Sequence, residues 1–184
     1  VDLQAEYQGK RPRLLVHRAM HKVRRKPVER LVEPCPGVLT LLQAVRDRHI
    51  PTALLSNGLG QGYGFDILKT FGLDAWFDGT VFRENLEHSK PHPDAIYKAL
   101  KAIQVTPGAD DVVWYIGDRH KDVRAALAAD KHLPCNVQPL AYGLNASFAI
   151  IESGLGADHI ITSYHEFLHT FLEIMDHQSV LETP

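Results

Sequence analysis

Short apolar runs alternate along residues 34–175 with segments in which apolar residues recur every three or four positions. The apolar runs predict buried strands at 52–55, 80–82, 112–116, 137–142 and 158–161. The periodic segments predict helices from residue 38 onward and at 65–71, 94–103, 146–153 and 164–175. This alternation predicts an α/β fold, a doubly wound parallel sheet with helices on both faces and right-handed crossovers.

Two local features refine this prediction. Pro139 cannot donate a backbone hydrogen bond, so the strand at 137–142 is expected at an edge, or the proline at a strand end. Glycines at positions 58, 60, 62 and 64 predict a flexible loop after the strand at 52–55.

Residues 1–33 differ from the rest because they are basic and weakly patterned. Apolar residues at 14, 15, 19, 20 and 23 predict one helix that ends near Lys26-Pro27. We interpret the basic run as a solvated face rather than a nucleic-acid surface. The sequence Pro34-Cys35-Pro36-Gly37 marks a junction, which divides the chain into residues 1–33 and 34–184.

Composition narrows the class of protein. Apolar residues make up 45%, charged residues 23%, and the net charge is -2, which is typical of a globular protein and favours neither nucleic acid nor a membrane as partner. No apolar run approaches the roughly 20 residues that span a bilayer. Only Cys35 and Cys135 are present, so we expect no disulfide framework and a cytoplasmic location.

Polar side chains follow three of the predicted strands. They are the pair Ser56-Asn57, the cation Lys90, and the acids Asp118 and Asp122. Strand ends of a parallel sheet converge at one edge, so these groups are expected to lie together. Hydroxyl, backbone N–H and lysine groups suit phosphoryl oxygens, and two carboxylates suit Mg²⁺. The set therefore predicts phosphoryl transfer, in which positioning and charge neutralisation dominate.

Three stretches carry a resemblance to a known family. LLSNG (54–58), SKPHPDAIYKAL (89–100) and YIGDRHKD (115–122) resemble motifs two, three and four of the haloacid dehalogenase superfamily, with phosphoglycolate-phosphatase-like members nearest in pattern. PCPGVLTLL (34–42) is similar to the segment by which members with a helical cap re-enter the core. The resemblance implies a Rossmann-like core at 34–184 and a remnant of the helical cap at 1–33.

The resemblance also implies a role for each site residue. Ser56 would hydrogen-bond the transferring phosphoryl group, with help from the loop at Asn57 and Gly58. Lys90 would stabilise the phosphoryl group and the nucleophile. Asp118 would ligate Mg²⁺, and Asp122 would ligate it directly, bind it through water, or orient Lys90.

One family motif does not occur in the printed sequence. The Asp-x-Asp motif that supplies the nucleophile and the general acid/base would lie upstream of the cap, and no such pair is found. The start at Val1 leads us to expect that the first strand and most of the cap lie outside this sequence. Catalysis through an aspartyl phosphate is then assigned to the parent protein, and the activity of this chain as written stays open.

Three functional hypotheses follow. The first is a Mg²⁺-dependent phosphatase of small phosphomonoesters. The second is a 2-haloacid dehalogenase, which needs no metal; the GDxxxD pattern at 117–122 argues against it. The third is a shortened, non-catalytic phosphate-binding or interaction module, which would expose a sheet edge and form a homodimer or exchange strands. The sequence identifies no substrate, because the cap largely sets specificity in this family.

Overall fold

The computed structural model describes residues 28–30 and 32–181. Its strands are short and pair only in parallel: β1 (Ala53–Leu55), β2 (Gly79–Val81), β3 (Val112–Gly117), β4 (Asn136–Tyr142) and β5 (Ile160–Ile161). The α-helices are α3 (Val38–Asp47), α4 (Gln61–Thr70), α5 (Asp94–Ala102), α6 (His120–Asp130), α7 (Leu144–Glu152) and α8 (Tyr164–Leu181). Short 3₁₀ turns are η1 (Val28–Arg30), η2 (Asp74–Trp76), η3 (Arg83–Asn85) and η4 (Ala157–His159). The predicted alternation of strands and helices is confirmed.

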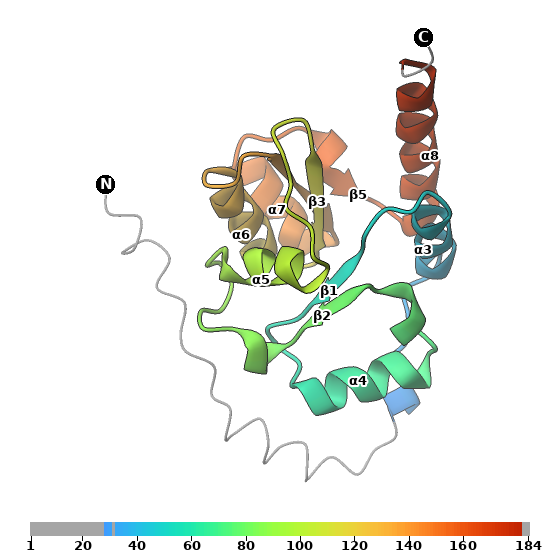
Figure 1. The fold of residues 1–184 in the computed structure, drawn as a ribbon, viewed down its shortest axis with the longest axis vertical. Helices are drawn as coiled ribbons and strands as arrows, with labels where there is room; N and C mark the ends of the chain where they lie inside the picture. The colour runs from blue at the N-terminus through green and yellow to red at the C-terminus, as the bar shows by residue number, and fades with distance from the viewer. Residues whose placement is uncertain (1–27, 31, 182–184) are drawn as a thin grey trace.

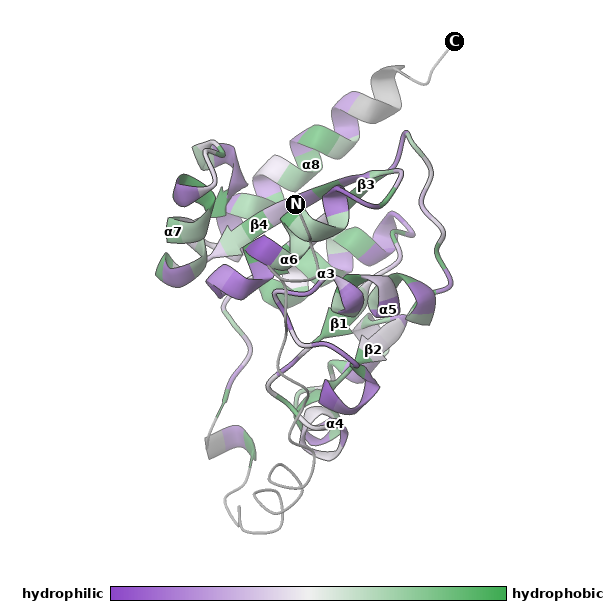
Figure 2. Ribbon diagram, turned by 90° about the vertical axis from the view of Figure 1, so that its left-hand side faces the viewer, coloured by the Kyte–Doolittle hydropathy of each residue, from purple (hydrophilic) through white to green (hydrophobic). Residues whose placement is uncertain are grey.

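Helices cover both faces of the strands, as the sequence predicts (Figure 1). Helices α5, α6 and α7 lie on one side, and α3 and α8 lie together on the other. Alternation along β3 explains this arrangement: Val113 and Tyr115 pack into the core shared with α5 and α6, whereas Trp114 makes edge-on contacts with Phe167 and Phe171 of α8. Strand β1 consists of apolar residues and is coloured as hydrophobic in Figure 2.

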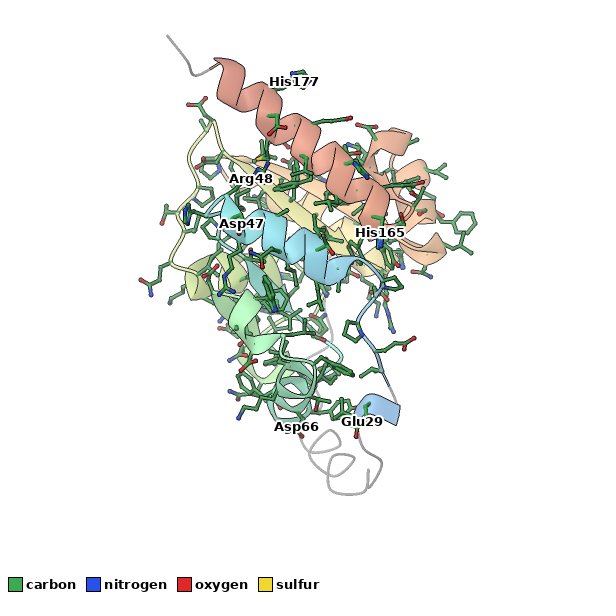
Figure 3. The ribbon with its side chains drawn as sticks, turned by 90° about the vertical axis from the view of Figure 1, so that its right-hand side faces the viewer. Glu29, Asp47, Arg48, Asp66, His165 and His177 are labelled. Atoms are coloured by element: carbon green, nitrogen blue, oxygen red, sulfur yellow. The ribbon has the colours of Figure 1, made fainter. Side chains whose placement is uncertain are left out.

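Helices α3 and α8 run side by side over the second face, and Figure 3 shows the end of α3 beside α8. There the Arg48 guanidinium lies 5.5 Å from the centre of the Phe171 ring and 3.5 Å from the Asp176 carboxylate. This layer therefore joins an early helix of the chain to its last one.

The strands form two hydrogen-bonded sheets rather than one. One sheet has the order β1-β2 and the other β3-β4-β5, and among the residues that the structure describes β1 and β3 do not pair. Helix α5 contacts β1 and β2 and also packs on α6, which in turn contacts β3 and β4. The helix layer is thus continuous across both sheets.

Pro139 lies on β4, between β3 and β5 in the strand order, so the prediction of an edge strand is wrong for β4 as a whole. However, β5 pairs only with Ala141 and Tyr142. At Pro139 the outer side of β4 meets no strand, and the Pro139 carbonyl accepts a hydrogen bond from His159 Nδ1 at 2.8 Å. The missing N–H is tolerated because no ladder bond is required there.

The glycine-rich loop is shorter than predicted because α4 begins at Gln61. A Cβ atom at Gly64 would lie 2.6 Å from Cζ of Phe82, so this glycine permits α4 to pack closely on the Phe82 ring. Its role is helix packing rather than loop flexibility.

Within the residues that the structure describes, no helix is long and apolar enough to cross a membrane. Cys35 and Cys135 are both free thiols, as expected. The cytoplasmic location stays a prediction. The predicted helix at 14–26 lies outside the described residues, as does most of the segment interpreted as a cap remnant.

Candidate active site

The predicted site residues follow the carboxyl ends of three strands. Ser56 and Asn57 come directly after β1, Asp118 comes directly after β3, and Lys90 lies on the loop between η3 and α5. The Ser56 N–H donates to the Val81 carbonyl at 2.9 Å, which extends the β1-β2 ladder by one residue. The fold thus places each group where parallel α/β sheets bind ligands.

The structure brings Lys90 together with Asp122 across a gap of 31 residues in sequence. Lys90 Nζ lies 2.5 Å from Asp122 Oδ1, and the two side chains are only 12% and 5% exposed. Lys90 Nζ also donates to Tyr115 Oη at 3.0 Å, and Tyr115 Oη donates to Asp122 Oδ1 at 3.2 Å. We call Lys90, Tyr115 and Asp122 the Lys90 cluster.

The turn from β3 into α6 fixes the position of Asp122. Asp122 Oδ2 accepts a hydrogen bond from the Arg119 N–H at 2.9 Å, and the Asp122 N–H donates to the Arg119 carbonyl at 2.8 Å. These bonds satisfy free backbone groups at the start of α6. A Cβ atom at Gly117 would lie 2.6 Å from Asp122 Cγ, so only glycine leaves room for the carboxylate. The sequence Gly-Asp-x-x-x-Asp therefore has a geometric basis.

Tyr115 remains a neutral phenol within this cluster. Burial raises its pKa well above the usual value of 10, and the negative charge of Asp122, its hydrogen bond to Asp122 and the charge of Asp118 act in the same direction. The hydroxyl therefore keeps its proton and donates it to the Asp122 carboxylate.

Asp118 differs from Asp122 in its surroundings. Its side chain is 72% exposed, and its only charged neighbour among the described residues is Arg119, whose Nε lies 3.9 Å from Asp118 Oδ2. Both Asp122 oxygens, by contrast, already accept hydrogen bonds or the Lys90 ion pair. Asp118 is thus free to coordinate a cation, and Asp122 is directed toward Lys90.

These contacts bear on the predicted magnesium site. Mg²⁺ takes oxygen ligands and is bound by one or two carboxylates together with waters and substrate phosphates. Over residues 28–30 and 32–181, no group of three or more His, Cys, Asp or Glu side chains is arranged to hold a metal ion. The part of the site that the structure describes fits Mg²⁺ through Asp118 as one direct carboxylate ligand, completed by waters and a phosphate.

Ser56, Asn57 and Gly58 form a separate part of the site. Ser56 Oγ accepts a hydrogen bond from the Leu59 N–H at 3.2 Å, which closes the turn after β1. Asn57 Oδ1 is buried without a hydrogen-bond partner, and Gly58 is exposed with open space around it. No hydrogen bond or ion pair within the described part of the chain joins Ser56 or Asn57 to the Lys90 cluster.

The loop that carries Lys90 is closed by Asp94 at the start of α5. Asp94 Oδ2 accepts hydrogen bonds from the backbone N–H groups of Glu87 and His88, at 3.1 and 3.3 Å. The Asp94 N–H donates to His92 Nδ1 at 3.1 Å, and burial lowers the pKa of His92. These bonds hold the loop on the helix, so that the Lys90 side chain projects toward β3 and α6.

Two polar groups at the site were not predicted. The sequence pattern predicts Tyr115 only as an apolar strand residue. In the structure it lies on the face of β3 that packs against the core shared with α5 and α6. Arg83 follows β2, and its Nε atom is buried without a hydrogen-bond partner. Arg83 could have been predicted from the sequence, because it directly follows the apolar run at 80–82.

Comparison with known proteins identifies the class that this fold and site define. The haloacid dehalogenase-like hydrolase family model matches residues 3–133. The chain therefore belongs to the haloacid dehalogenase-like hydrolase family, and the predicted resemblance is confirmed.

Two curated relatives show which proteins of this family the chain is similar to. The chain is 24% identical over 156 residues to a phosphorylated carbohydrates phosphatase of Thermotoga maritima, covering 85% of this chain and 68% of the relative. It is 29% identical over 101 residues to pyrophosphatase PpaX of Anoxybacillus flavithermus, covering 55% of this chain and 39% of the relative.

Solved structures agree on the fold. A putative beta-phosphoglucomutase of Thermotoga maritima matches with a TM-score of 0.57 and 26% identity, over 76% of this chain and 60% of that structure. A superfamily hydrolase of Ehrlichia chaffeensis also gives a TM-score of 0.57, at 20% identity, over 77% of this chain and 58% of that structure. The chain thus spans about 60% of the length of these structures.

Proposed function

We propose that this chain carries the phosphate and metal site of a Mg²⁺-dependent phosphatase acting on small phosphomonoesters. The observation that carries the proposal is the Lys90 cluster, in which a nearly buried ammonium group is held by Asp122 beside the exposed carboxylate of Asp118. A fixed cation next to a free carboxylate suits a phosphoryl group and a divalent cation bound side by side.

Each residue then has a defined task. Lys90 neutralises charge on the phosphoryl oxygens, and Asp122 keeps Lys90 in place. Ser56 and the amide group of Asn57 donate hydrogen bonds to the phosphoryl group, with the exposed Gly58 leaving the loop open to the ligand. Asp118 would hold Mg²⁺, which when bound supplies further charge neutralisation.

Named relatives support this class of substrate. Proteins to which the chain is similar are named phosphorylated carbohydrates phosphatase, pyrophosphatase and beta-phosphoglucomutase, and each name refers to chemistry at a phosphoryl group. The matched regions cover only part of those proteins, so we propose small phosphomonoesters as the class of substrate and no single substrate.

A non-catalytic phosphate-binding module is the second candidate. It is favoured by one specific observation, the lack of an Asp-x-Asp pair in the printed sequence. Homodimerisation stays a prediction of this second candidate; it would use the edges of β1 and β3 that pair with no strand among the described residues. The dehalogenase hypothesis gains no support from the exposed Asp118, because halide displacement needs no metal ligand.

The decisive experiment measures binding and turnover separately. Orthophosphate binding is followed by calorimetry with and without Mg²⁺, and phosphate release is followed over a panel of phosphomonoesters. We expect Lys90→Ala to weaken orthophosphate binding strongly, leaving residual binding, and Asp118→Asn to abolish its enhancement by Mg²⁺. The exposed residues Lys101 and Asp110 provide matched controls, Lys101→Ala and Asp110→Asn, which should bind like the wild type.

The outcomes separate the two candidates. Binding with turnover supports the phosphatase, and binding without turnover supports the phosphate-binding module. Orthophosphate binding as tight in Lys90→Ala as in the wild type would refute both.

A further inference from the structure

The Tyr115 hydroxyl lies between the two charged groups of the Lys90 cluster. Its oxygen accepts a hydrogen bond from Lys90 Nζ at 3.0 Å and donates one to Asp122 Oδ1 at 3.2 Å. The direction of both bonds is unambiguous, because an ammonium group can only donate and a carboxylate can only accept. Tyr115 thus closes a triangle whose third side is the direct contact of Lys90 with Asp122.

A count of donors shows what this triangle achieves. The Lys90 ammonium group has three N–H donors. One is directed to Asp122 and one to Tyr115, and within the described residues the third has no protein acceptor. These two contacts both oppose rotation of the ammonium group about Cε–Nζ, so the third N–H has a preferred direction.

We infer that Tyr115 is a positioning residue, whose hydroxyl fixes the Lys90 ammonium group so that its remaining N–H is presented to a bound phosphate. This inference rests on the proposed function, since it assigns the free donor to the phosphoryl ligand. With Asp122 alone, one contact rather than two would oppose rotation of the ammonium group.

A purely structural role for Tyr115 makes a different prediction. The Tyr115 ring also packs in the core formed by α5, α6 and β3, where it would contribute through burial alone. Tyr115→Phe keeps the ring and removes only the hydroxyl. Tyr97→Phe is the matched control, because Tyr97 packs against the same core and its hydroxyl makes no hydrogen bond or ion pair within the described residues.

The test measures orthophosphate affinity by calorimetry in the wild type, Tyr115→Phe, Lys90→Met and the double variant. We expect Tyr115→Phe to weaken binding about tenfold, which corresponds to the loss of one hydrogen bond to a charged group. It should weaken residual binding no further in the Lys90→Met background, and Tyr97→Phe should bind like the wild type. Equal weakening in both backgrounds, or none in either, would overturn the inference.

A second measurement is independent of phosphate binding. Lysine labelled with ¹⁵N at Nζ gives an ammonium signal when its protons are held by hydrogen bonds and exchange slowly. We expect the Lys90 signal in the wild type and in Tyr97→Phe, and its loss in Tyr115→Phe. If the wild type failed to bind orthophosphate, the proposed function would fail, and this measurement would still decide the inference: a signal unchanged in Tyr115→Phe overturns it.

Discussion

Replacing Lys90 with methionine should destabilise the fold far more than replacing an exposed lysine. Lys90→Met keeps a chain of similar length but removes the charge that faces Asp122. The Asp122 carboxylate, 5% exposed, would then be buried without its counter-charge. Its remaining donors are the Arg119 N–H and the Tyr115 hydroxyl.

The expected magnitude follows from this geometry. Removing one partner of a buried ion pair costs about 3–5 kcal/mol, because the other charge is left uncompensated. Two hydrogen bonds to Asp122 remain, so we expect the lower end, about 3 kcal/mol. The double variant Lys90→Met/Asp122→Asn buries no charge and keeps an acceptor for the Arg119 N–H. We therefore expect it to be more stable than Lys90→Met alone, by about 1–2 kcal/mol.

Urea unfolding followed by circular dichroism measures these differences without adding salt. The slope of the free energy of unfolding against urea should stay unchanged, since the surface exposed on unfolding is the same. Lys98→Met is the matched control, because Lys98 pairs with Glu87 at 2.9 Å and the two side chains are far more exposed than those of Lys90 and Asp122, at 33% and 73%. An exposed pair contributes little, so this control should unfold like the wild type.

Two results would refute this reasoning. If Lys90→Met unfolds at the same urea concentration as Lys98→Met, the ion pair does not act as a buried one. If adding Asp122→Asn lowers the stability of Lys90→Met further, Asp122 is stabilised by groups other than Lys90.

Two further predictions concern the same region. Gly117→Ala places a Cβ atom 2.6 Å from Asp122 Cγ, so we expect the free energy of unfolding in urea to fall by about 1–3 kcal/mol. Gly62→Ala on α4 is the control, because a Cβ atom there meets nothing within 4 Å. We expect this control to be neutral or stabilising by up to about 1 kcal/mol. Burial raises the pKa of Tyr164 to about 12, and negative charge on the neighbouring Cys35 acts in the same direction. Unfolded tyrosine titrates near pH 10, so the stability due to this group is fully present below about pH 10 and is lost as the pH rises toward 12. In urea titrations, the free energy of unfolding of Tyr164→Phe should therefore fall less over that pH range than that of the wild type. An equal fall in both proteins would contradict the raised pKa of Tyr164.

The sequence pattern predicted the type and order of the elements well, because hydrophobic period reports burial directly. Strand β3 and helix α5 lie within a residue of their predicted ranges. The errors occur where a tertiary contact overrides a local preference. Gly62 and Gly64 indicated a loop, yet they lie in α4, and Gly64 is required there by the Phe82 ring. Pro139 indicated an edge strand, whereas β4 is an internal strand. Because β5 is short and pairs only with Ala141 and Tyr142, the side of β4 at Pro139 is left without a neighbouring strand.

The sequence predicted which polar residues follow the strands, and their role as a site stays a prediction. It did not predict how these residues contact one another. Sequence order showed that Lys90, Asp118 and Asp122 follow strands, which is a backbone property. It left open whether Asp122 faces a metal or Lys90, and the contacts of both Asp122 oxygens favour Lys90. Tyr115 escaped prediction because an aromatic residue in an apolar strand is indistinguishable, by period, from a core residue.

The Lys90 cluster also links the two sheets, so ligand binding at Lys90 should affect the stability of the fold. Lys90 belongs to the loop after β2, whereas Tyr115 and Asp122 belong to β3 and α6, and β1 and β3 share no ladder within the described residues. Besides the packing of α5 on α6, this buried polar contact joins the two sheets at the edge where we propose that phosphate binds. A phosphate that binds the free N–H of Lys90 would therefore be bound at the junction itself. Ligand binding should for this reason raise the free energy of unfolding of the wild type, and Lys90→Met should lose both that gain and part of the basal stability.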